Sequence, residues 1–571
     1  MALQKGLLHV CQTTPRLCCC VANHHSFSKI LDGQIPQSFQ HIKEINAISS
    51  KKQKVKFEAS MEQVLKGGGK KGIQRHVVRN KKMLVRDRIK LLLDKDSETL
   101  ELSALAGLGM EYGDVPCAGA VTLVGKIHGL WCMVVGNDAT VKSGSIYPIT
   151  LKKQLRAQQI AAENRLPTVH LVDSGGAFLP LQSEIFNPGG RIFYNEAVMS
   201  AAGISQVAVV CGSCTAGAAY IPAMADEAVI LDKIGTIFLG GPPLVQAATG
   251  EKVTAEELGG ASLHCRQSGC TDHFATSEEM ALATARDIIA TINLENSTNA
   301  TSYEEPLHDV TQLNSLAPSH GVGYQLDSRY TLAHIVDGSA FHEFKEHFGT
   351  TLVTGFGRVK GHLAGFVANN GRLSGPAALK GSHFVQLCSQ RNIPLVYLQH
   401  FTDNSTRSAA ASDNTETEAE ISSLVKSHAQ LMQAVACCGV PSISLATGGI
   451  IGTLESHSLG SLSMGSRFQF IYPNVRVGGH DPVYLAKNLS KAQLPDAPED
   501  QVNQRMLDNY EKHSAETESF FAASRMFNDG IILPEQTRDV IAKCLSVFQQ
   551  ERTAYARYKP SVDGQQTNFR M

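Results

Sequence analysis

The sequence of 571 residues predicts an α/β protein made of two similar domains in tandem. Between residues 121 and 293, short apolar runs alternate with helix-length segments, which is the pattern of strands connected by helices. The same order of segments starts again after residue 303, so we interpret the chain as the internal repeat of a whole domain. The length agrees, because 571 residues exceed what one hydrophobic core organises.

The apolar runs predict the elements of each repeat in order. In the first repeat we expect a strand at 130–135, a helix at 150–164, and strands at 168–172 and 207–210. In the second repeat we expect strands at 351–353 and 364–368, a helix at 378–391, and strands at 393–398 and 442–445. The segments Leu166–Leu171 and Ile393–Leu398 both place a proline second in an apolar run, so they occupy equivalent places.

Bulk composition narrows the classes of function. Hydrophobic residues make up 43% of the chain and charged residues 18%, as in water-soluble globular proteins. The formal net charge of -1 provides no global attraction to nucleic acid or to an anionic membrane. The nearest approach to a membrane span, residues 203–225, is interrupted by polar residues, glycines and a proline. We therefore expect neither nucleic acid nor a membrane among the partners.

The first 31 residues differ in composition from the rest of the chain. Lys5, Arg16 and Lys29 occur among serines and threonines, and no acidic residue precedes Asp32. This composition is typical of a mitochondrial transit peptide, and a disordered tail is the alternative. We accordingly expect the protein in the mitochondrial matrix. The division that we predict is a leader at 1–31, a first domain at 50–297 and a second domain at 304–571.

Each repeat continues from an apolar strand into a run of small residues. Gly212 to Tyr220 follows the strand at 207–210, and Thr447 to Thr453 follows the strand at 442–445. A turn without bulky side chains lets backbone N–H groups approach a ligand oxygen closely. The Gly217–Ala218 turn is therefore a candidate oxyanion site, and the turn at Ala177, after the neighbouring strand, can converge on it. Close packing of a strand on a helix is the alternative.

Three other patterns suggest chemistry. Asp173-Ser174-Gly175-Gly176 resembles a nucleophilic serine turn, but the sequence places no general base against it, so we favour backbone donors. Cys211 and Cys214 form a C-x-x-C, yet a zinc site requires a second pair with similar spacing, so we expect buried thiols and no metal. Four cations are candidate ligands for the phosphates of a nucleotide-containing molecule, with surface charge as the alternative: Lys142, Lys152, Lys153 and Arg156.

These residues closely resemble the carboxyltransferase (beta) subunits of 3-methylcrotonyl-CoA carboxylases, within the acyl-CoA carboxylase family. The resemblance extends over nearly all of the chain after the leader and is most specific in the first half. The segments that carry it are 137–142, 152–158, 171–180, 212–227, 235–239, 241–245, 258–261 and the final Phe569-Arg570-Met571.

The resemblance implies two tandem crotonase-like (ClpP/crotonase) domains. It also implies transfer of a carboxyl group from carboxybiotin to an acyl-CoA, with 3-methylcrotonyl-CoA of leucine catabolism as the expected acceptor. Donors at Gly217 and Ala218 would stabilise the thioester enolate, and donors at Gly452 and Thr453 the ureido oxygen of biotin. Residues expected to contact acyl-CoA are Ala177, Phe178, Lys142, Lys152, Lys153 and Arg156.

The partners are implied by the same resemblance. The chain contains no Ala-Met-Lys-Met biotinylation motif and no recognisable ATP-binding carboxylase half. Biotin is therefore expected in trans, on a biotinylated alpha subunit. A homo-oligomeric beta core is also expected, and no metal cofactor.

The second half departs from the family pattern at its proposed site. Asp403 to Arg407 stands where the family has a Gly-Phe-Met-Val-Gly run, and Leu454 and Glu455 replace small or neutral residues. A carboxylate beside a developing anion opposes the charge that such a site must stabilise. In the first half, Glu184 to Arg191 is shorter than in the family, which would reshape the acyl pocket.

Three functions remain open from the sequence. The first is a working carboxyltransferase subunit, and this is the one we favour. The second is a catalytically impaired relative that binds acyl-CoA or assembles with carboxylase subunits. The third is a hydratase or hydrolase using only the first site, which would require a carboxylate or histidine over the Gly217 turn.

Overall fold

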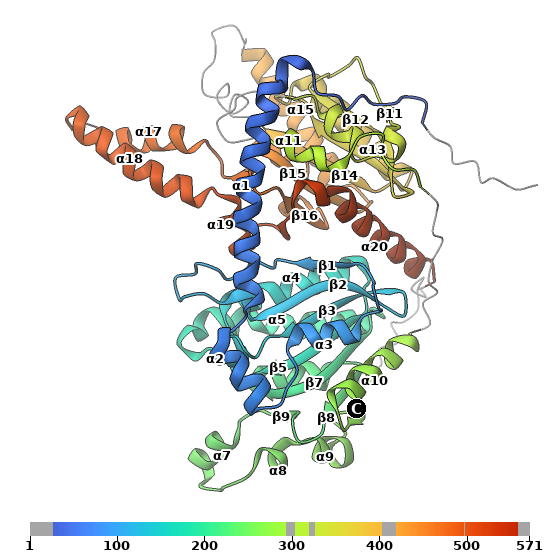
Figure 1. The fold of residues 1–571 in the computed structure, drawn as a ribbon, viewed down its shortest axis with the longest axis vertical. Coiled ribbons are helices and arrows are strands. Elements are labelled where there is room, and N and C mark those ends of the chain that lie inside the picture. The colour runs from blue at the N-terminus through green and yellow to red at the C-terminus, as the bar shows by residue number, and fades with distance from the viewer. Residues whose placement is uncertain (1–26, 293–302, 319–325, 402–417, 496, 558–571) are drawn as a thin grey trace, which may run out of the picture.

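The structure is a computed structural model that describes residues 27–292, 303–318, 326–401, 418–495 and 497–557. It contains two large sheets, one in each half of the chain, and both have the same topology (Figure 1). The strand order is β1-β2-β3-β5-β7-β8-β10 in the first sheet and β11-β12-β13-β14-β15-β16-β18 in the second. In both, an antiparallel hairpin joins a run of parallel strands. The predicted α/β repeat is confirmed.

The strands lie close to their predicted positions. Those of the first half are β1 (Thr99–Leu102), β2 (Ala120–Ile127), β3 (Leu130–Asn137), β4 (Ser145–Ile146), β5 (Thr168–Ser174), β6 (Gly176–Ala177), β7 (Gln206–Thr215), β8 (Glu227–Leu231), β9 (Thr236–Phe238) and β10 (His273–Ala275). Those of the second half are β11 (His342–Glu343), β12 (Leu352–Val359), β13 (His362–Asn369), β14 (Leu395–Phe401), β15 (Ser442–Ile451), β16 (Phe468–Ile471), β17 (Arg476–Val477) and β18 (Gly530–Ile531).

Helices connect the strands and cover much of the two sheets, while α17 and α18 project away from them (Figure 1). In the first half they are α1 (Gln40–Leu65), α2 (Gly69–Ile73), α3 (Val85–Leu92), α4 (Pro148–Asn164), α5 (Gln182–Ala201), α6 (Tyr220–Met224), α7 (Pro242–Thr249), α8 (Ala255–Gly259), α9 (Ala261–Leu263) and α10 (Glu278–Ala290). In the second half they are α11 (Leu313–Leu316), α12 (Ser328–Ala333), α13 (Gly375–Gln390), α15 (Glu418–Ala436), α16 (Leu454–His457), α17 (Pro482–Gln493), α18 (Glu499–Glu516), α19 (Ser519–Ser524) and α20 (Thr537–Arg557).

The repeat extends to ion pairs. Asp94 accepts hydrogen bonds from the β2–β3 turn, from the N–H of Gly129 at 2.7 Å, and pairs with Arg286 at 2.9 Å. Asp337 does the same in the second half, with the N–H of Gly361 at 2.7 Å and Arg538 at 2.6 Å. Because an aspartate joins a strand turn to the final helix of each half, both halves are stabilised in the same way.

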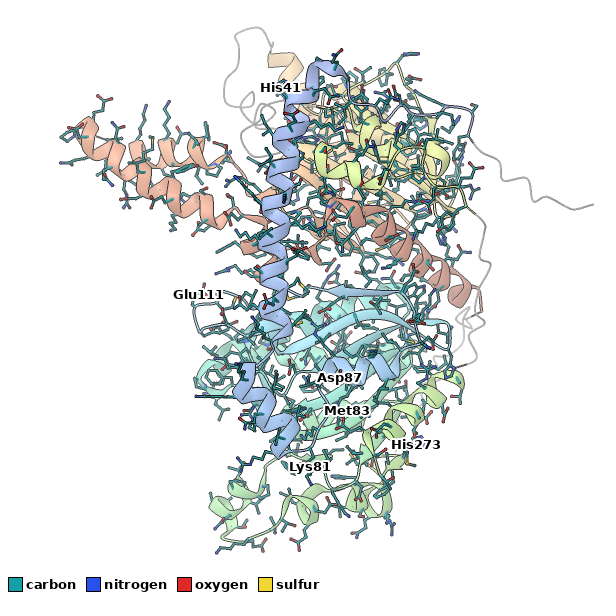
Figure 2. The ribbon with its side chains drawn as sticks, viewed as in Figure 1. His41, Lys81, Met83, Asp87, Glu111 and His273 are labelled. Carbon is teal, nitrogen blue, oxygen red and sulfur yellow. The ribbon has the colours of Figure 1, made fainter. Side chains whose placement is uncertain are left out.

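Two helices link the halves. Figure 1 shows α1 running alongside both sheets and α20 lying between them, and Figure 2 shows side chains filling the space between the ribbons. Trp131 of β3 is tied to α20 by its indole N–H, which donates to Ser546 at 3.0 Å, and by backbone bonds to Gln550. Arg156 of α4 forms a bidentate ion pair with Asp529, with N···O distances of 2.8 and 2.9 Å. The halves therefore share one continuous hydrophobic core.

The predicted ends of two strands require adjustment. Strands β7 and β15 extend to Thr215 and Ile451, beyond the predicted ends at 210 and 445, so the glycines Gly448 and Gly449 lie in a strand. Gly449 is needed there because a Cβ would lie 1.4 Å from the carbonyl oxygen of Phe401. The segment Glu184 to Arg191 lies within helix α5 even though it contains a proline.

The predicted leader and loop fall largely outside the described residues. Residues 1–26 of the leader are among these, whereas Lys29 pairs with Glu343 at 2.6 Å and Leu31 is buried. Asp403 to Arg407 and most of the Ser408 to Glu420 loop are also outside them. Each sheet lies within one predicted domain, 50–297 or 304–571, and the exact boundaries stay a prediction. Within the described parts of the chain, no helix combines the length and apolar character that crossing a membrane requires.

Candidate active site

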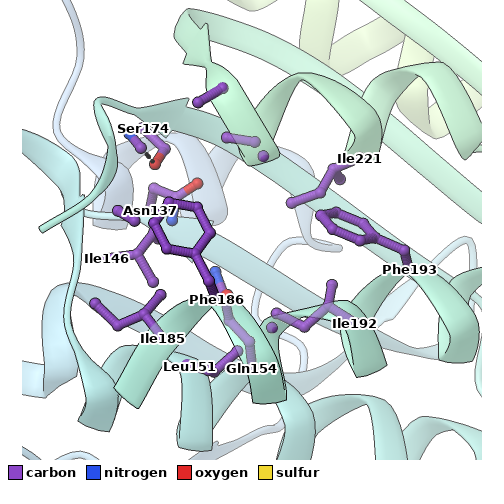
Figure 3. Close-up of a pocket in the computed structure, with 16 residues that line it drawn as sticks. Asn137, Ile146, Leu151, Gln154, Ser174, Ile185, Phe186, Ile192, Phe193 and Ile221 are labelled. Atoms are coloured by element: carbon purple, nitrogen blue, oxygen red, sulfur yellow. Dashed lines mark hydrogen bonds between the residues drawn. The ribbon is translucent and has the colours of Figure 1, made fainter. Parts of the chain in front are cut away.

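A cavity of about 100 Å³ lies at the carboxyl ends of β3, β5 and β7, walled by α4 and α5 (Figure 3). Three residues predicted from the sequence line it: Ala177, Gly217 and Ala218. The carboxyl ends of parallel strands are where α/β sheets usually bind ligands. The other lining residues are Asn137, Ile146, Leu151, Gln154, Ser174, Gly176, Ile185, Phe186, Gly189, Ile192, Phe193, Ala216 and Ile221.

Residues of the turn after β7 line the cavity. Ala216 has a positive φ of 55°, an unusual conformation for a residue with a side chain, and it begins a short 3-10 helix over Ala216–Ala219. The first N–H groups of a helix have no intrahelical partner. Among the described residues, no side chain or loop carbonyl accepts from the N–H of Gly217 or Ala218. A ligand oxygen in the cavity can therefore meet these donors.

The two predicted turns do converge. Gly176 has a φ of 86°, and a Cβ on it would lie 3.2 Å from the carbonyl oxygen of Thr215 and 3.6 Å from the Cβ of Ala216. Glycine is thus required by both its conformation and its contact with the neighbouring turn. This close approach brings Ala177 and Gly217 to the same cavity.

A buried charge cluster supports the strand ends beneath the cavity. Asp173 pairs with Lys82 at 3.1 Å and with Arg88 at 3.4 Å, and Arg88 also binds Glu278. At Gly212, a Cβ would lie 2.1 Å from Oδ1 of Asp173, so only glycine fits beside this carboxylate. Buried charges persist where each has an opposite partner, and here they join β5 to α3 and α3 to α10.

The described lining contains no titratable side chain. The hydroxyl of Ser174 donates to the carbonyl oxygen of Gly144 at 3.0 Å and accepts from the N–H of Gly176, so it is held by the backbone. The nearest histidine in sequence, His170, is buried and its ring contacts Gln206 at 3.4 Å. Neither a nucleophilic serine nor a hydratase-type acid is assembled here.

The predicted phosphate ligands divide into two groups. The ammonium of Lys153 is buried and donates to the carbonyl oxygens of Ser103 and Cys117, at 3.0 and 3.1 Å. Arg156 is paired with Asp529, as described above. Both side chains therefore hold the protein together and do not reach the cavity, because the helix turns these positions away from it.

The remaining predicted contacts lie nearer to solvent. Lys142 is exposed on the turn that supplies Gly144, next to Ser174. The ammonium of Lys152 donates to the carbonyl oxygen of Arg525 at 2.7 Å. Phe178 stacks on Tyr147 with ring centroids 4.5 Å apart, beside the cavity and not among its lining residues. Neither lysine lines the cavity, so a phosphate contact at Lys142 or Lys152 stays a prediction.

The corresponding turn of the second half is closed by its own side chains. The N–H of Gly452 donates to the hydroxyl of Ser456 at 2.8 Å, and that hydroxyl donates to the carbonyl oxygen of Thr453 at 2.9 Å. The N–H of Ser456 donates in turn to the hydroxyl of Thr453 at 3.2 Å. The donor predicted at Gly452 is therefore already satisfied within the loop.

A carboxylate also lies at this second turn. The side chain of Glu455 is 17% exposed and lies 3.8 Å from the Nε of Arg372. Burial raises the pKa of Glu455 above its usual range, while Leu373 and Arg372 partly oppose the shift. Nearby, burial lowers the pKa of His400 to about 4, and its Nε2 has no hydrogen-bond partner among the described residues. The described part of the second turn therefore presents a satisfied Gly452 amide and a carboxyl group with a raised pKa.

The two cysteines of the C-x-x-C pattern are buried thiols. Cys211 and Cys214 are both free and buried, and burial raises the pKa of Cys211 to about 11. No group of three or more metal-ligating side chains occurs in the part of the chain that the structure describes.

Sequence reasoning missed most of the cavity wall. Gln154 was passed over in favour of its charged neighbours, although it lies three residues after Leu151, on the same helix face. The aromatic residues Phe186 and Phe193 were not among the residues predicted to contact acyl-CoA, although both line the cavity. The helical spacing of Ile185, Gly189 and Ile192 is the signal that identifies this wall.

Comparisons with known proteins identify the family. The carboxyl transferase domain family matches residues 76–561. The chain is 46% identical to the probable methylcrotonoyl-CoA carboxylase beta chain, mitochondrial, of Drosophila melanogaster, over 85% of this chain and 86% of that protein. It is 44% identical to the corresponding beta chain of Arabidopsis thaliana, over 86% and 84%. The solved beta subunit of P. aeruginosa geranyl-CoA carboxylase matches with a TM-score of 0.81 at 30% identity, covering 92% of this chain and 97% of that one. This chain is therefore a member of the carboxyl transferase family.

Proposed function

We propose that this protein transfers a carboxyl group to an acyl-CoA, with 3-methylcrotonyl-CoA as the expected acceptor. The observation that carries the proposal is the first-half cavity, where the amides of Gly217 and Ala218 face an apolar chamber. The relatives named above as methylcrotonoyl-CoA carboxylase beta chains support this choice of acceptor.

The chain's own residues would perform the acyl-CoA half of the reaction. The amides at Gly217 and Ala218 polarise the thioester carbonyl and stabilise the negative charge that develops on its oxygen, and one such donor contributes roughly 3 kcal/mol. The apolar side chains of Ile185, Ile192 and Phe193 hold the acyl group and exclude water. Low polarity around the oxyanion strengthens its interaction with the amides.

Biotin carried by a partner subunit supplies the carboxyl group in this family, and we propose a biotinylated alpha subunit as that partner. We also propose several copies of this chain in the assembly and location in the mitochondrial matrix. The relatives of Drosophila and Arabidopsis are named mitochondrial, which supports the organelle.

Reconstitution tests the proposal. The purified chain is combined with a biotinylated alpha subunit, and incorporation of labelled bicarbonate into 3-methylcrotonyl-CoA is followed with and without ATP. We expect incorporation that depends on ATP and on biotin. An assembled complex that binds acyl-CoA but incorporates no label contradicts transfer.

A second candidate function is acyl-CoA binding or carboxylase assembly without transfer. The observation that favours it is the closed second turn, where Ser456 occupies the N–H of Gly452 and Glu455 adds a carboxylate. The same reconstitution separates the two candidates, because this one requires acyl-CoA affinity or complex formation together with absent turnover.

A further inference from the structure

Two amide side chains face the first-half cavity without a full set of hydrogen bonds. Gln154 of α4 is 7% exposed, lines the cavity, and its side chain has no hydrogen-bond partner among the described residues. Asn137 of β3 is 5% exposed; its Oδ1 accepts from the N–H of Asp173 at a long 3.4 Å, and no described residue accepts from its Nδ2. Figure 3 shows both side chains among those that surround the cavity.

Such groups call for a ligand. A buried amide without a partner destabilises a protein by about 1–3 kcal/mol, so native structures rarely keep one without a reason. Lys153, the neighbour of Gln154, is turned away and bonded to backbone carbonyls, and Ser174 is also satisfied. The free side-chain donors of the described lining are therefore these two neutral amides.

The second half shows that this arrangement is not a requirement of the fold. Asn369 occupies the place of Asn137 at the end of its strand, and both ends of its amide bind the backbone of His400 at 2.6 Å. Lys380 occupies the place of Lys153, since each lysine stands fifteen residues before the next strand, at Leu395 and Thr168. The residue after Lys380 is Gly381, where Gln154 stands in the first half.

We propose that Gln154 and Asn137 bind the carboxylate of a carboxylated acyl-CoA in this cavity. The inference rests on the proposed function, in which the acyl group gains a carboxylate beside these walls. A carboxylate among apolar side chains requires hydrogen-bond donors, and the two NH₂ groups supply them without adding charge. Neutral donors also suit an acceptor whose carboxylate appears only after transfer, because the uncarboxylated substrate then meets no unpaired cation. The ligand class is a short acyl-CoA with a distal carboxylate.

Binding measurements test this without requiring turnover. Calorimetry with the full chain compares glutaryl-CoA with pentanoyl-CoA, which has the same number of acyl carbons and no distal carboxylate. We expect Gln154→Met to weaken glutaryl-CoA about tenfold or more, as for a lost hydrogen bond to a charged group, and to change pentanoyl-CoA less than twofold. The control is Gln159→Met on the same helix, whose exposed amide contacts Glu163 and which should change neither affinity.

A second variant tests the same role in case Gln154→Met fails to fold. Gln154→Glu places a titratable acceptor where a donor stood, so glutaryl-CoA should bind more weakly at pH 8 than at pH 5, beyond any pH change in the wild type. Equal losses for both ligands, or no loss in either variant, overturn the role of Gln154 and leave the proposed function standing. If the wild type binds pentanoyl-CoA but not glutaryl-CoA, this inference fails alone; if it binds neither of these nor 3-methylcrotonyl-CoA, both proposals fail.

Discussion

The turns after β7 and β15 occupy equivalent places in the two sheets, but they differ in whether their backbone N–H groups are free to bind a ligand. Each follows a parallel strand at the centre of its sheet, after Thr215 in the first half and after Ile451 in the second. At the first turn, Gly217 faces the cavity, and no described side chain binds its N–H. At the second turn, Ser456 accepts from the N–H of Gly452.

The difference comes from one position in each turn. Ser456 lies four residues after Gly452, and Tyr220 lies four residues after Ala216. The hydroxyl of Ser456 folds back onto the turn, whereas the ring of Tyr220 packs 5.4 Å from that of Phe193 and leaves the amides open. An oxyanion site therefore depends on the residues just beyond the turn as much as on the small residues within it.

The largest expected effect on carboxylation comes from a substitution that disrupts the first turn. Ala218→Pro removes one N–H and stiffens the 3-10 helix, so carboxylation in the reconstituted complex should fall about 100-fold, the usual result of losing an oxyanion donor. The matched variant is Leu454→Pro, at the corresponding position after β15, where proline begins helix α16. If the second turn is inactive, this variant leaves the rate unchanged. An equal loss in both variants shows that both turns act.

The next largest effect concerns the stability of helix α5, which forms one wall of the first-half cavity. Glu196 of α5 is fully buried and neither carboxyl oxygen has a partner among the described residues, whereas Met432 stands at the corresponding place, ten residues before β15. Burial, and then Asp226, raises the pKa of Glu196 well above its usual value. The folded state therefore holds this proton, and stability declines as pH rises above the ordinary value of 4.5.

Glu196→Gln should remove that decline. At pH 8 we expect the free energy of unfolding to increase by about 1–2 kcal/mol, with a smaller gain at pH 5 because the wild-type carboxyl is neutral there. Denaturation in urea at both pH values measures the change. A gain that is equal at both pH values contradicts a titration origin.

A smaller effect is expected from a substitution that frees the N–H of Gly452 in the second turn. Ser456→Ala removes the acceptor from the N–H of Gly452 and should strengthen binding of a biotin analogue by about 1 kcal/mol, roughly the value of one hydrogen bond. The control is Ser463→Ala, which removes an exposed hydroxyl of the following loop. If Ser456→Ala weakens transfer or binding, Ser456 supports the site and does not block it.

The smallest effect concerns Lys142. In the second half, Ser374 stands five residues beyond β13, as Lys142 stands five residues beyond β3, and its hydroxyl caps α13 by accepting from the N–H of Ala377. Lys142→Ala should weaken acyl-CoA binding about threefold, since an exposed cation contributes less than about 1 kcal/mol to an ion pair. The loss should shrink at high salt, as screening requires. A loss that is unaffected by salt excludes a phosphate contact.

Particular residues show where sequence reasoning succeeded. The β5 and β14 strands were predicted from their apolar runs, and the Gly217–Ala218 turn lies at a cavity as expected. These features depend on the spacing of apolar and small residues over short segments, and this spacing can be read from the sequence. Lys153 and Arg156 show the limit of sequence reasoning. Their charge predicted phosphate binding, but in the fold each side chain binds a group of the protein itself.

The sequence alone determined the duplicated sheets, the small-residue turns after β7 and β15, and the family. The sheets and the turns follow from local periodicity and from the backbone freedom of small residues, whereas the family follows from the resemblance of particular segments. Only the tertiary structure decided which amides remain open, and which side of α4 meets the cavity. Hydrogen bonds act over about 3 Å, so the partner of Gly452 or Gln154 depends on how helices and loops pack around it.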